Sequence, residues 1–412
     1  MKKLFFILMT ATAVYGQGIL GLSDGYESMI QPHKLVYQEH SAQLFALAEF
    51  ADEVTAFDPD SKEVNVLQLY EPSQNLIGLF QGTTQHNTFT ELINSIAAGP
   101  GGGTADAYYT PTGSMKAGQV LFGVTYALSD YFSVQATVPI RYAKLYDVSW
   151  KYTGNLHLFA DQLIANEVIS SFESNVKSLF NLDLTGWSQT GFGDLSALVH
   201  YEQPFKQYKK YLKQVTAHFH MGLTFPTGKQ GDVNTLMPMD FDYDGAYGLP
   251  FGGGLDLDLG KVVQVGFRAD FWHYFSNQKL RRVKAFGSQT SLLMSKVAQV
   301  WKNYGFIQQF TLFAQLKNFY KGFSAKVSYD YYRKGIDTVS LQDSSLDWLT
   351  INASAELDEQ TRHHVLLSLM YDALYETDIA CRPQFELFVK IPFNGSRSVL
   401  ASTVGILCSL DF

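Results

Sequence analysis

A strict alternation of apolar and polar residues, which recurs from residue 116 to the C-terminus, restricts the fold of this chain more than any other feature. In the first segment Val120, Phe122 and Val124 occupy even positions, whereas Gln119 and Thr125 occupy odd ones. Because successive side chains of a strand point to opposite faces, a period of two predicts strands with one apolar face. Twelve segments show the pattern, and they cover residues 119–128, 132–142, 195–201, 215–225, 249–259, 263–271, 306–316, 323–331, 349–357, 365–371, 385–391 and 400–412.

The apolar faces of these segments carry no Asp, Glu, Lys or Arg, although 17% of the chain is charged. A soluble β-sandwich also alternates, but it rarely needs twelve strands of membrane-spanning length. Short turns and long polar connections follow one another along the chain, which is typical of outer-membrane barrels. The sequence therefore predicts an all-β fold, a transmembrane antiparallel β-barrel that occupies residues 116–412.

The strand number is predicted only as a range. If the short turns face the periplasm, the strand that begins at Ala117 runs inward, so another strand must precede it, and residues 62–70 are the best candidate. With this strand the total would be thirteen, whereas a barrel whose C-terminus lies in the periplasm needs an even number of strands. We therefore expect 12–14 strands. The chain ends on Phe412, which resembles the C-terminal aromatic signature of bacterial outer-membrane barrels.

The first residues predict export. Lys2 and Lys3 precede an apolar run at residues 4–14 and small residues around Gly16, which is the pattern of a cleavable signal peptide at residues 1–16. We expect the mature chain in the cell outer membrane, with the lipid bilayer and lipopolysaccharide as partners. The net charge of −8 lacks the basic footprint of a nucleic-acid binder, so nucleic acid is not an expected partner.

Residues 17–115 lack the alternation. We interpret them as a partly helical plug or hatch in the barrel, or alternatively as a periplasmic segment. Apolar residues recur with a helical period in residues 38–54 and 88–98, before a Gly-rich tract. Two long loops, at residues 161–180 and 288–301, carry similar patterns, and we expect them to cap the outer mouth.

The inward faces hold the charged residues, of which ten are acidic and five are basic: Asp194, Glu202, Asp256, Asp258, Asp270, Asp330, Glu356, Asp372, Glu386, Asp411, Arg141, Arg268, Lys317, Lys326 and Lys390. If all line the lumen, the pore should favour cations over anions; alternatively they form a paired network that stiffens the wall. The residues expected to line the solute path are Arg141, Asp194, His200, Glu202, His218, His220, Asp256, Arg268, Asp270, Lys326 and Asp330.

Three of these residues also suit a metal ion. His200, His218 and His220 point inward on adjacent predicted strands, with Glu202 nearby. Imidazoles two residues apart on one strand share a face, so the group suits either a metal or ordinary lumen hydrogen bonds.

A possible calcium loop lies at residues 240–245, where Asp240, Asp242, Asp244 and Gly245 match the first half of the pattern D-x-D-x-D-G. The twelfth position is Phe251 where calcium loops have Glu. The three aspartates are therefore either a metal site or part of an acidic surface loop. The sequence indicates no other cofactor.

Basic residues gather in one predicted outer loop, where they suit either lipopolysaccharide phosphates or solvent: Lys279, Arg281, Arg282 and Lys284. The two cysteines, Cys381 and Cys408, are not expected to form a bridge, because Cys408 falls on the lipid-facing side of its strand.

Two short motifs carry a family resemblance. Gly191-Phe192-Gly193-Asp194-Leu195 opens a strand, and Phe225-Pro226-Thr227-Gly228-Lys229 follows after the next hairpin. With the strand start Thr361-Arg362-His363-His364 and the strand at 385–393, they resemble the outer-membrane transporters of the meta-cleavage pathway of phenol degradation, which are related to the long-chain fatty-acid (FadL-like) channels. The resemblance implies a barrel that passes hydrophobic or aromatic small molecules, in some members past an N-terminal hatch.

These features predict a porin-like channel or transporter for small, hydrophobic or aromatic solutes through a plugged barrel, and not an enzyme. The alternative is a structural or adhesive outer-membrane surface protein that uses its long loops. An outer-membrane phospholipase would need a Ser, a His and a polar group together at the membrane boundary. The outward faces offer only His273, His363 and Ser402, with no matched set.

Overall fold

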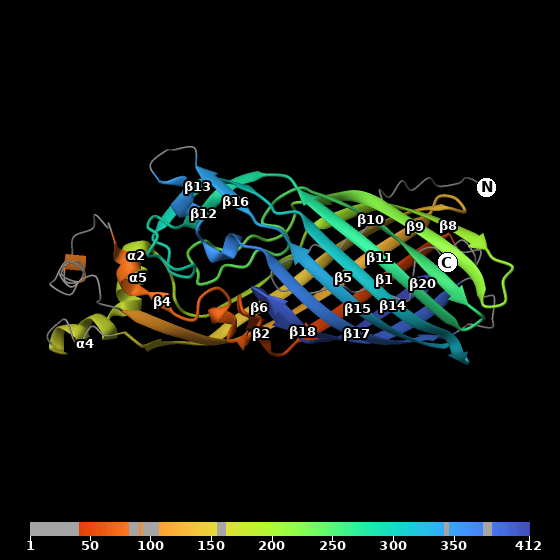
Figure 1. Cartoon of the computed structure of the whole chain (residues 1–412), viewed down its shortest axis with the longest axis horizontal. Coiled ribbons are helices and arrows are strands. Elements are labelled where there is room, and N and C mark those ends of the chain that lie inside the picture. The colour runs from red at the N-terminus through yellow and green to blue at the C-terminus, as the bar shows by residue number, and fades with distance from the viewer. Residues whose placement is uncertain are drawn as a thin grey trace.

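The main element of the computed structural model, which describes residues 41–81, 90–91, 93, 107–154, 162–341, 346–373 and 381–412, is a closed antiparallel β-barrel (Figure 1). Its twelve wall strands are β1 (Ala42–Ala51), β5 (Tyr108–Ala127), β6 (Phe132–Tyr152), β8 (Leu195–Lys206), β9 (Leu212–Phe225), β10 (Gly248–Leu259), β11 (Val263–Tyr274), β14 (Ile307–Tyr320), β15 (Phe323–Lys334), β17 (Gln360–Asp372), β18 (Arg382–Ser396) and β20 (Thr403–Asp411). They pair in the order β5-β1-β20-β18-β17-β15-β14-β11-β10-β9-β8-β6, and β6 pairs with β5 to close the wall. The barrel and its predicted range of strands are confirmed.

Eleven of the twelve alternating segments are wall strands, and residues 349–357 are the exception. They form helix α6 (Trp348–Ile351) and the 3₁₀ turn η3 (Ala355–Leu357) in a connection outside the wall. Residues 62–70 are not the missing strand either, because they contain only the short β3 (Glu63–Val64) and the 3₁₀ turn η1 (Val66–Gln68). Among the described residues, no helix is long and apolar enough to cross a membrane.

The remaining wall strand is β1, so the helix predicted across residues 38–54 is wrong. This segment pairs along its whole length with β5 on one edge and with β20 on the other. Leu44 and Phe50 face outward, whereas Leu47 and Glu49 are buried in the interior. Alanines at both faces weaken the alternation and favour helix locally, but pairing on two edges overrides that propensity.

Both ends of the wall lie at the end of the barrel that carries the short turns. The amide of Ala42 donates to the carbonyl oxygen of Phe412 at 2.8 Å, so the first and last wall strands begin and end together. Outer-membrane barrels place their short turns in the periplasm and their long loops outside the cell. The long connections, at the left of Figure 1, are accordingly extracellular.

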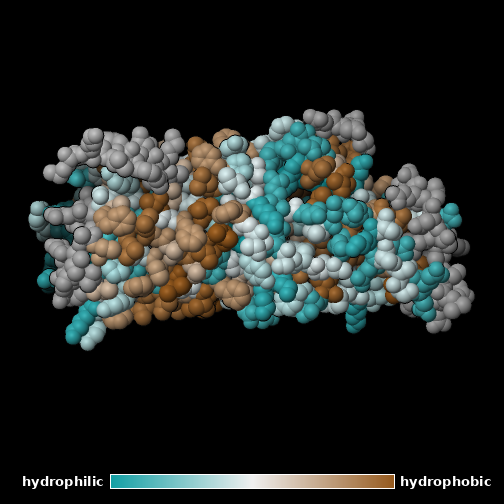
Figure 2. Space-filling model, turned by 180° about the vertical axis from the view of Figure 1, so that it is seen from behind, coloured by the Kyte–Doolittle hydropathy of each residue, from teal (hydrophilic) through white to brown (hydrophobic). Residues whose placement is uncertain are grey.

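The outer surface of the wall is apolar. Figure 2 shows a broad brown band over the barrel and a mostly teal and white surface over the loops. Near the loop end, aromatic rings follow one another across neighbouring strands with centroids 5.0–6.3 Å apart, in the order Phe251, Phe271, Phe310, Tyr331, His363 and Phe393. Such a girdle marks the membrane interface of outer-membrane barrels. The closed wall and its uncharged belt indicate that this is an outer-membrane protein.

The interior near β1, β17, β18 and β20 is packed with apolar side chains. Leu47, Leu121, Leu366, Phe388 and Leu407 form one buried cluster there. The ring of Phe388 lies against Gly405 on the adjacent strand, where a Cβ atom would come within 2.2 Å of it. These side chains pack against one another inside this part of the wall.

The long connections carry the smaller elements. Strands β5 and β6 continue beyond the wall as a ribbon that bears β4 (Gln74–Asn75), β7 (Trp187–Phe192), α2 (Leu76–Phe80), α4 (Gln162–Ser170) and α5 (Phe172–Phe180). Two three-stranded sheets stand nearby, one of β19 (Ser398–Ala401), β2 (Val54–Phe57) and β3, the other of β12 (Asn277–Val283), β13 (Lys296–Asn303) and β16 (Thr338–Leu341).

Helices α4 and α5 confirm the helical prediction for residues 161–180 within the described range. The helix predicted at residues 288–301 is wrong, because its second half is β13, which pairs with β12 and β16. Residues 1–40 lie outside the described ranges, so the signal peptide at 1–16 stays a prediction. The described residues 52–81 lie at the loop end of the barrel. The plug expected in residues 17–115 also stays a prediction. Of the helix expected at residues 88–98, only positions 90, 91 and 93 are described, and these three are helical.

Candidate functional site

One side of the lumen, formed by β8 to β11, brings together seven of the residues expected on the solute path: His200, Glu202, His218, His220, Asp256, Arg268 and Asp270. The strand register sets His200 opposite His220 and Glu202 opposite His218. His218 Nε2 lies 2.9 Å from Asp256 Oδ2, and its Nδ1 lies 3.4 Å from Glu202 Oε2. Arg268 also reaches Asp256, at 3.4 Å. The side chains thus form one polar network.

Lys326 and Asp330 stand on the next part of the wall. The ammonium of Lys326 lies 4.4 Å from the ring centroid of Phe313, and Asp330 accepts a 2.6 Å hydrogen bond from Thr311 Oγ1. Together with His220 Nε2, 3.2 Å from Asp270 Oδ1, these contacts favour the interpretation that inward charges stiffen the wall. A preference for cations stays a prediction.

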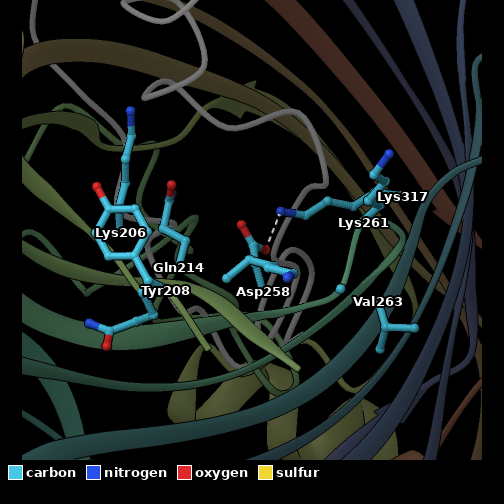
Figure 3. A pocket seen from close by; sticks show the side chains of 10 residues that line it. Lys206, Tyr208, Gln214, Asp258, Lys261, Val263 and Lys317 are labelled. Atoms are coloured by element: carbon cyan, nitrogen blue, oxygen red, sulfur yellow. Dashed lines mark hydrogen bonds and ion pairs between the residues drawn. The ribbon is translucent and has the colours of Figure 1, made fainter. Parts of the chain in front are cut away.

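At the periplasmic end, a cavity of about 330 Å³ opens among the turns (Figure 3). Lys206, Lys213 and Lys261 line it with exposed side chains. Lys317 pairs there with Asp258 at 2.6 Å. The lining of this cavity therefore has four lysines and one acidic residue, Asp258, although the inward positions as a whole were counted as mainly acidic.

The two motifs that carry the family resemblance meet at the extracellular end of β8 and β9. The register pairs Leu195 with Phe225. The amide of Leu195 donates to Thr227 Oγ1, and the amide of Gly228 donates to Asp194 Oδ1, both at 2.8 Å. We call this set of contacts the clasp. It directs the β9–β10 loop, residues 226–247, back over the barrel mouth.

Asp242 on that loop is held against the wall. Its Oδ1 lies 2.5 Å from Arg141 Nη2, with both side chains almost fully buried, and its Oδ2 accepts a hydrogen bond from the amide of Asp194. Gly193 allows this approach, because a Cβ atom there would meet Asp242 Oδ2 at 2.0 Å. Burial, and then the negative charge of Asp242, raise the pKa of Asp194 to about 7. Arg141, Asp242 and Asp194 form what we call the latch.

The three aspartates of the suggested calcium loop face different cations. Asp242 belongs to the latch, Asp240 lies 2.9 Å from Lys279 Nζ, and Asp244 pairs with Lys279 and Arg281. Within the part of the chain that the structure describes, no three His, Cys, Asp or Glu side chains are grouped to hold a metal. The calcium site and the histidine metal site stay predictions.

Above the barrel mouth, the extracellular loops surround a cavity of about 210 Å³, which we call the vestibule. Its lining combines aliphatic side chains with four tyrosines: Tyr70, Tyr243, Tyr304 and Tyr332. Tyr243 stacks on Tyr274 with centroids 3.7 Å apart, and its hydroxyl lies 3.4 Å from that of Tyr332. These three rings belong to a buried layer, the floor, that also includes Trp272. The floor separates the vestibule from the polar network of the lumen.

Ion pairs surround the vestibule. Three residues of the basic cluster that was suggested to bind lipopolysaccharide form ion pairs here. Lys279 pairs with Asp240, Arg281 pairs with Asp244, and Lys284 Nζ lies 3.9 Å from Glu71 Oε1. Asp337 lies 2.9 Å from Lys302 Nζ and 2.7 Å from Lys334 Nζ. Burial alone would raise the pKa of Asp337, but these two ammonium groups outweigh it and lower the pKa.

Sequence reasoning missed the vestibule almost entirely. Its walls come from connections far apart in the chain that lack periodicity, and Tyr70, Lys302 and Asp337 gave no signal. Glu356 was expected on the inward face of a strand; it lies in η3 instead, but it does line the vestibule. Of the residues weighed for a hydrolase, His363 forms a 2.8 Å hydrogen bond between its Nδ1 and the hydroxyl of Tyr329.

The chain was also compared with known proteins. No family model matches it, and no curated protein does. Among solved structures, an outer membrane channel from Pseudomonas putida F1 is similar over 90% of this chain and 96% of that one, at 9% identity and a TM-score of 0.49. The toluene transporter TodX of P. putida covers 93% and 92% of the chains, at 9% identity and a TM-score of 0.34. The β domain of the Bordetella autotransporter BrkA covers 90% and 100%, at 8% identity and a TM-score of 0.37.

Proposed function

We propose that this protein is an outer-membrane channel for small apolar or aromatic solutes, which enter at the vestibule and pass the floor when the β9–β10 loop moves. The observation that carries the proposal is the vestibule, a cavity with aliphatic and tyrosine walls directly above the lumen. Cavities that bind small molecules are mainly apolar with a few placed polar groups. The vestibule has aliphatic and tyrosine side chains for an apolar solute, and it also has ten charged lining residues, most of which pair with one another or with Arg141. The sequence resemblance to transporters of phenol-degrading pathways agrees with it.

In this proposal the solute path has four parts in series. They are the vestibule, the floor of Tyr243, Tyr274 and Tyr332, the polar network around His218, and the basic periplasmic cavity. The floor and the packed interior make the described conformation a closed one. Opening requires a displacement of Tyr243, which the latch restrains through the adjacent Asp242.

Filling the vestibule tests the proposal. Val339 lines the cavity from β16, so Val339→Trp should obstruct it, whereas Leu349→Trp changes an exposed residue of α6 outside the lining. Toluene uptake by cells that produce the Val339→Trp variant should fall toward that of cells without the protein, and the Leu349→Trp variant should match the wild type. Unchanged uptake in both variants would contradict entry through the vestibule.

A structural or adhesive surface protein is the second candidate, and the burial of the inward side chains on β17, β18 and β20 favours it. It predicts no difference in toluene uptake between cells with and without the protein.

A plug in the N-terminal region needs its own test. Because β1 belongs to the wall, a deletion of residues 17–110 would remove a wall strand. Deletion of residues 17–40 leaves β1 intact, and a rise in bilayer conductance would support the plug.

A further inference from the structure

We propose that the vestibule selects apolar molecules that carry one hydrogen-bond donor, an O–H or N–H group, and that the carboxylate of Glu356 accepts this bond. The inference rests on the proposed function, because it names the substrate class of the same cavity. It makes Glu356 a specificity-determining residue of the channel.

Glu356 differs from the other carboxylates around the vestibule. Five acidic residues line the cavity, and four of them pair with basic side chains: Asp240 with Lys279, Asp242 with Arg141, Asp244 with Arg281, and Asp337 with Lys302. Within the described ranges, the carboxylate of Glu356 accepts no hydrogen bond and lies in no ion pair. One acceptor in the lining is therefore available to a ligand.

The position of Glu356 places that acceptor in the lining of the cavity. The short turn η3 holds it between Ser354 and Leu357, two buried residues that also line the cavity. Burial raises the pKa of Glu356, although Lys302 and Arg281 act in the opposite direction. Glu356 is itself only half-buried and lines the cavity, so a donor on a ligand can supply the hydrogen bond that no described side chain supplies.

The rest of the lining sets the other properties of the ligand. Apolar side chains such as Leu292 and Val339, with Tyr70 and Tyr304, favour an aromatic or aliphatic body. Pockets for drug-sized ligands measure about 300–1,000 Å³, and the vestibule, at about 210 Å³, suits a smaller molecule of roughly one ring. The lysine ammonium groups of the lining already pair with aspartates, so they are not available to a carboxylate on a ligand. The negative charge of Glu356 would also repel such a group, so anionic solutes are disfavoured.

Two isomers isolate the donor. Benzyl alcohol and anisole have the same atoms, but only benzyl alcohol has an O–H group. Calorimetric titration of the full-length protein in lipid nanodiscs, corrected with empty nanodiscs, should give about tenfold tighter binding of benzyl alcohol, as one hydrogen bond to a charged acceptor allows. Benzylamine in the same assay distinguishes an ammonium donor from a neutral one.

Variants then assign the preference to one residue. Glu356→Leu should bind both isomers equally, and Glu356→Gln, which keeps an acceptor oxygen, should retain part of the preference. Glu359→Gln is the matched control, because Glu359 pairs with Arg333 and does not line the vestibule; it should retain the full preference. Unchanged binding of anisole by the Glu356 variants will show that the cavity is intact.

The outcomes separate this inference from the proposed function. Equal binding of the isomers by the wild type, or a preference that survives in Glu356→Leu, overturns the role of Glu356 while the vestibule remains a solute site. Failure of benzyl alcohol, anisole and toluene alike to bind overturns both.

Discussion

Replacing Asp242 by Asn removes one charge of the latch and little else. Asp242 has a φ of 84°, in the left-handed region that Asn tolerates nearly as well as Asp, so the substitution preserves the backbone. The partner, Arg141, has a side chain only 2% exposed. In the variant, this buried guanidinium loses the carboxylate that lies 2.5 Å away.

The expected magnitude follows from that burial. Removing one partner of a buried ion pair costs about 3–5 kcal/mol, because the other charge is left uncompensated. Asp194 also acts on Arg141 and replaces part of the lost attraction, so we expect about 3 kcal/mol against loop closure. This corresponds to an increase on the order of 10²-fold in the population with the β9–β10 loop displaced.

Two measurements report this displacement. Amide hydrogen exchange of residues 236–246, which are largely buried in the closed loop, should accelerate by the same factor. Planar-bilayer recordings should show more frequent openings, because Tyr243 leaves the floor with the loop. The control is Asp183→Asn, which breaks the exposed pair between Asp183 and Lys177. Such surface pairs contribute only about 0–1 kcal/mol, so exchange at residues 236–246 should not change.

Arg141→Gln combined with Asp242→Asn gives a further check. With both charges gone, no uncompensated group remains, so the double variant should be less open than the sum of the single variants predicts. If Asp242→Asn retains the exchange protection and conductance of the wild type, the loop is held by its other contacts and the latch has no role in gating.

Two other predictions concern pH and the membrane belt. Because the pKa of Asp194 is raised, its proton stabilises the closed loop fully below the ordinary pKa of about 4, and this contribution disappears as pH rises through about 7. The protection factor of residues 236–246, which is the intrinsic exchange rate at each pH divided by the observed rate, should therefore fall between about pH 5 and pH 8. Asp194→Asn should abolish that fall, and a protection factor that does not change with pH in the wild type would contradict the prediction. Leu312 is 53% exposed on the outer face, so Leu312→Arg should lower the free energy of unfolding in liposomes by about 2–4 kcal/mol. The control, Leu349→Arg in the exposed helix α6, should have little effect. Equal effects of the two substitutions would contradict lipid contact at Leu312.

Most of the wall was predictable because its physical cause is local in sequence. A strand with lipid on one face and a polar interior on the other must alternate, and eleven segments did so in the correct register. The failures have the same origin. In β1, small residues occupy both faces, and in residues 349–357 an alternation arises by chance in a loop where Leu349 is exposed and Leu357 is buried.

The lumen network was predictable for the same reason, because a period of two and short hairpins fix which side chains are opposite one another. His218 and Glu202 are cross-strand neighbours as expected. The vestibule was not predictable, since its lining comes from several connections whose proximity depends on the closed barrel. The two motifs were visible in the sequence, but their contacts with each other, and with Asp242, became apparent only from the register of β8 and β9.

That register also explains why one loop can control both the latch and the floor. Since Leu195 is opposite Phe225, the residues before β8 and after β9 leave the wall at the same point, and the clasp turns the loop inward there. The consecutive residues Asp242 and Tyr243 then contact the wall and the floor, respectively. A solute that displaces Tyr243 must therefore strain the latch, and a weakened latch must loosen the floor. The effects of Asp242→Asn and of a solute on opening should consequently be non-additive, whereas independent gates would give effects that add.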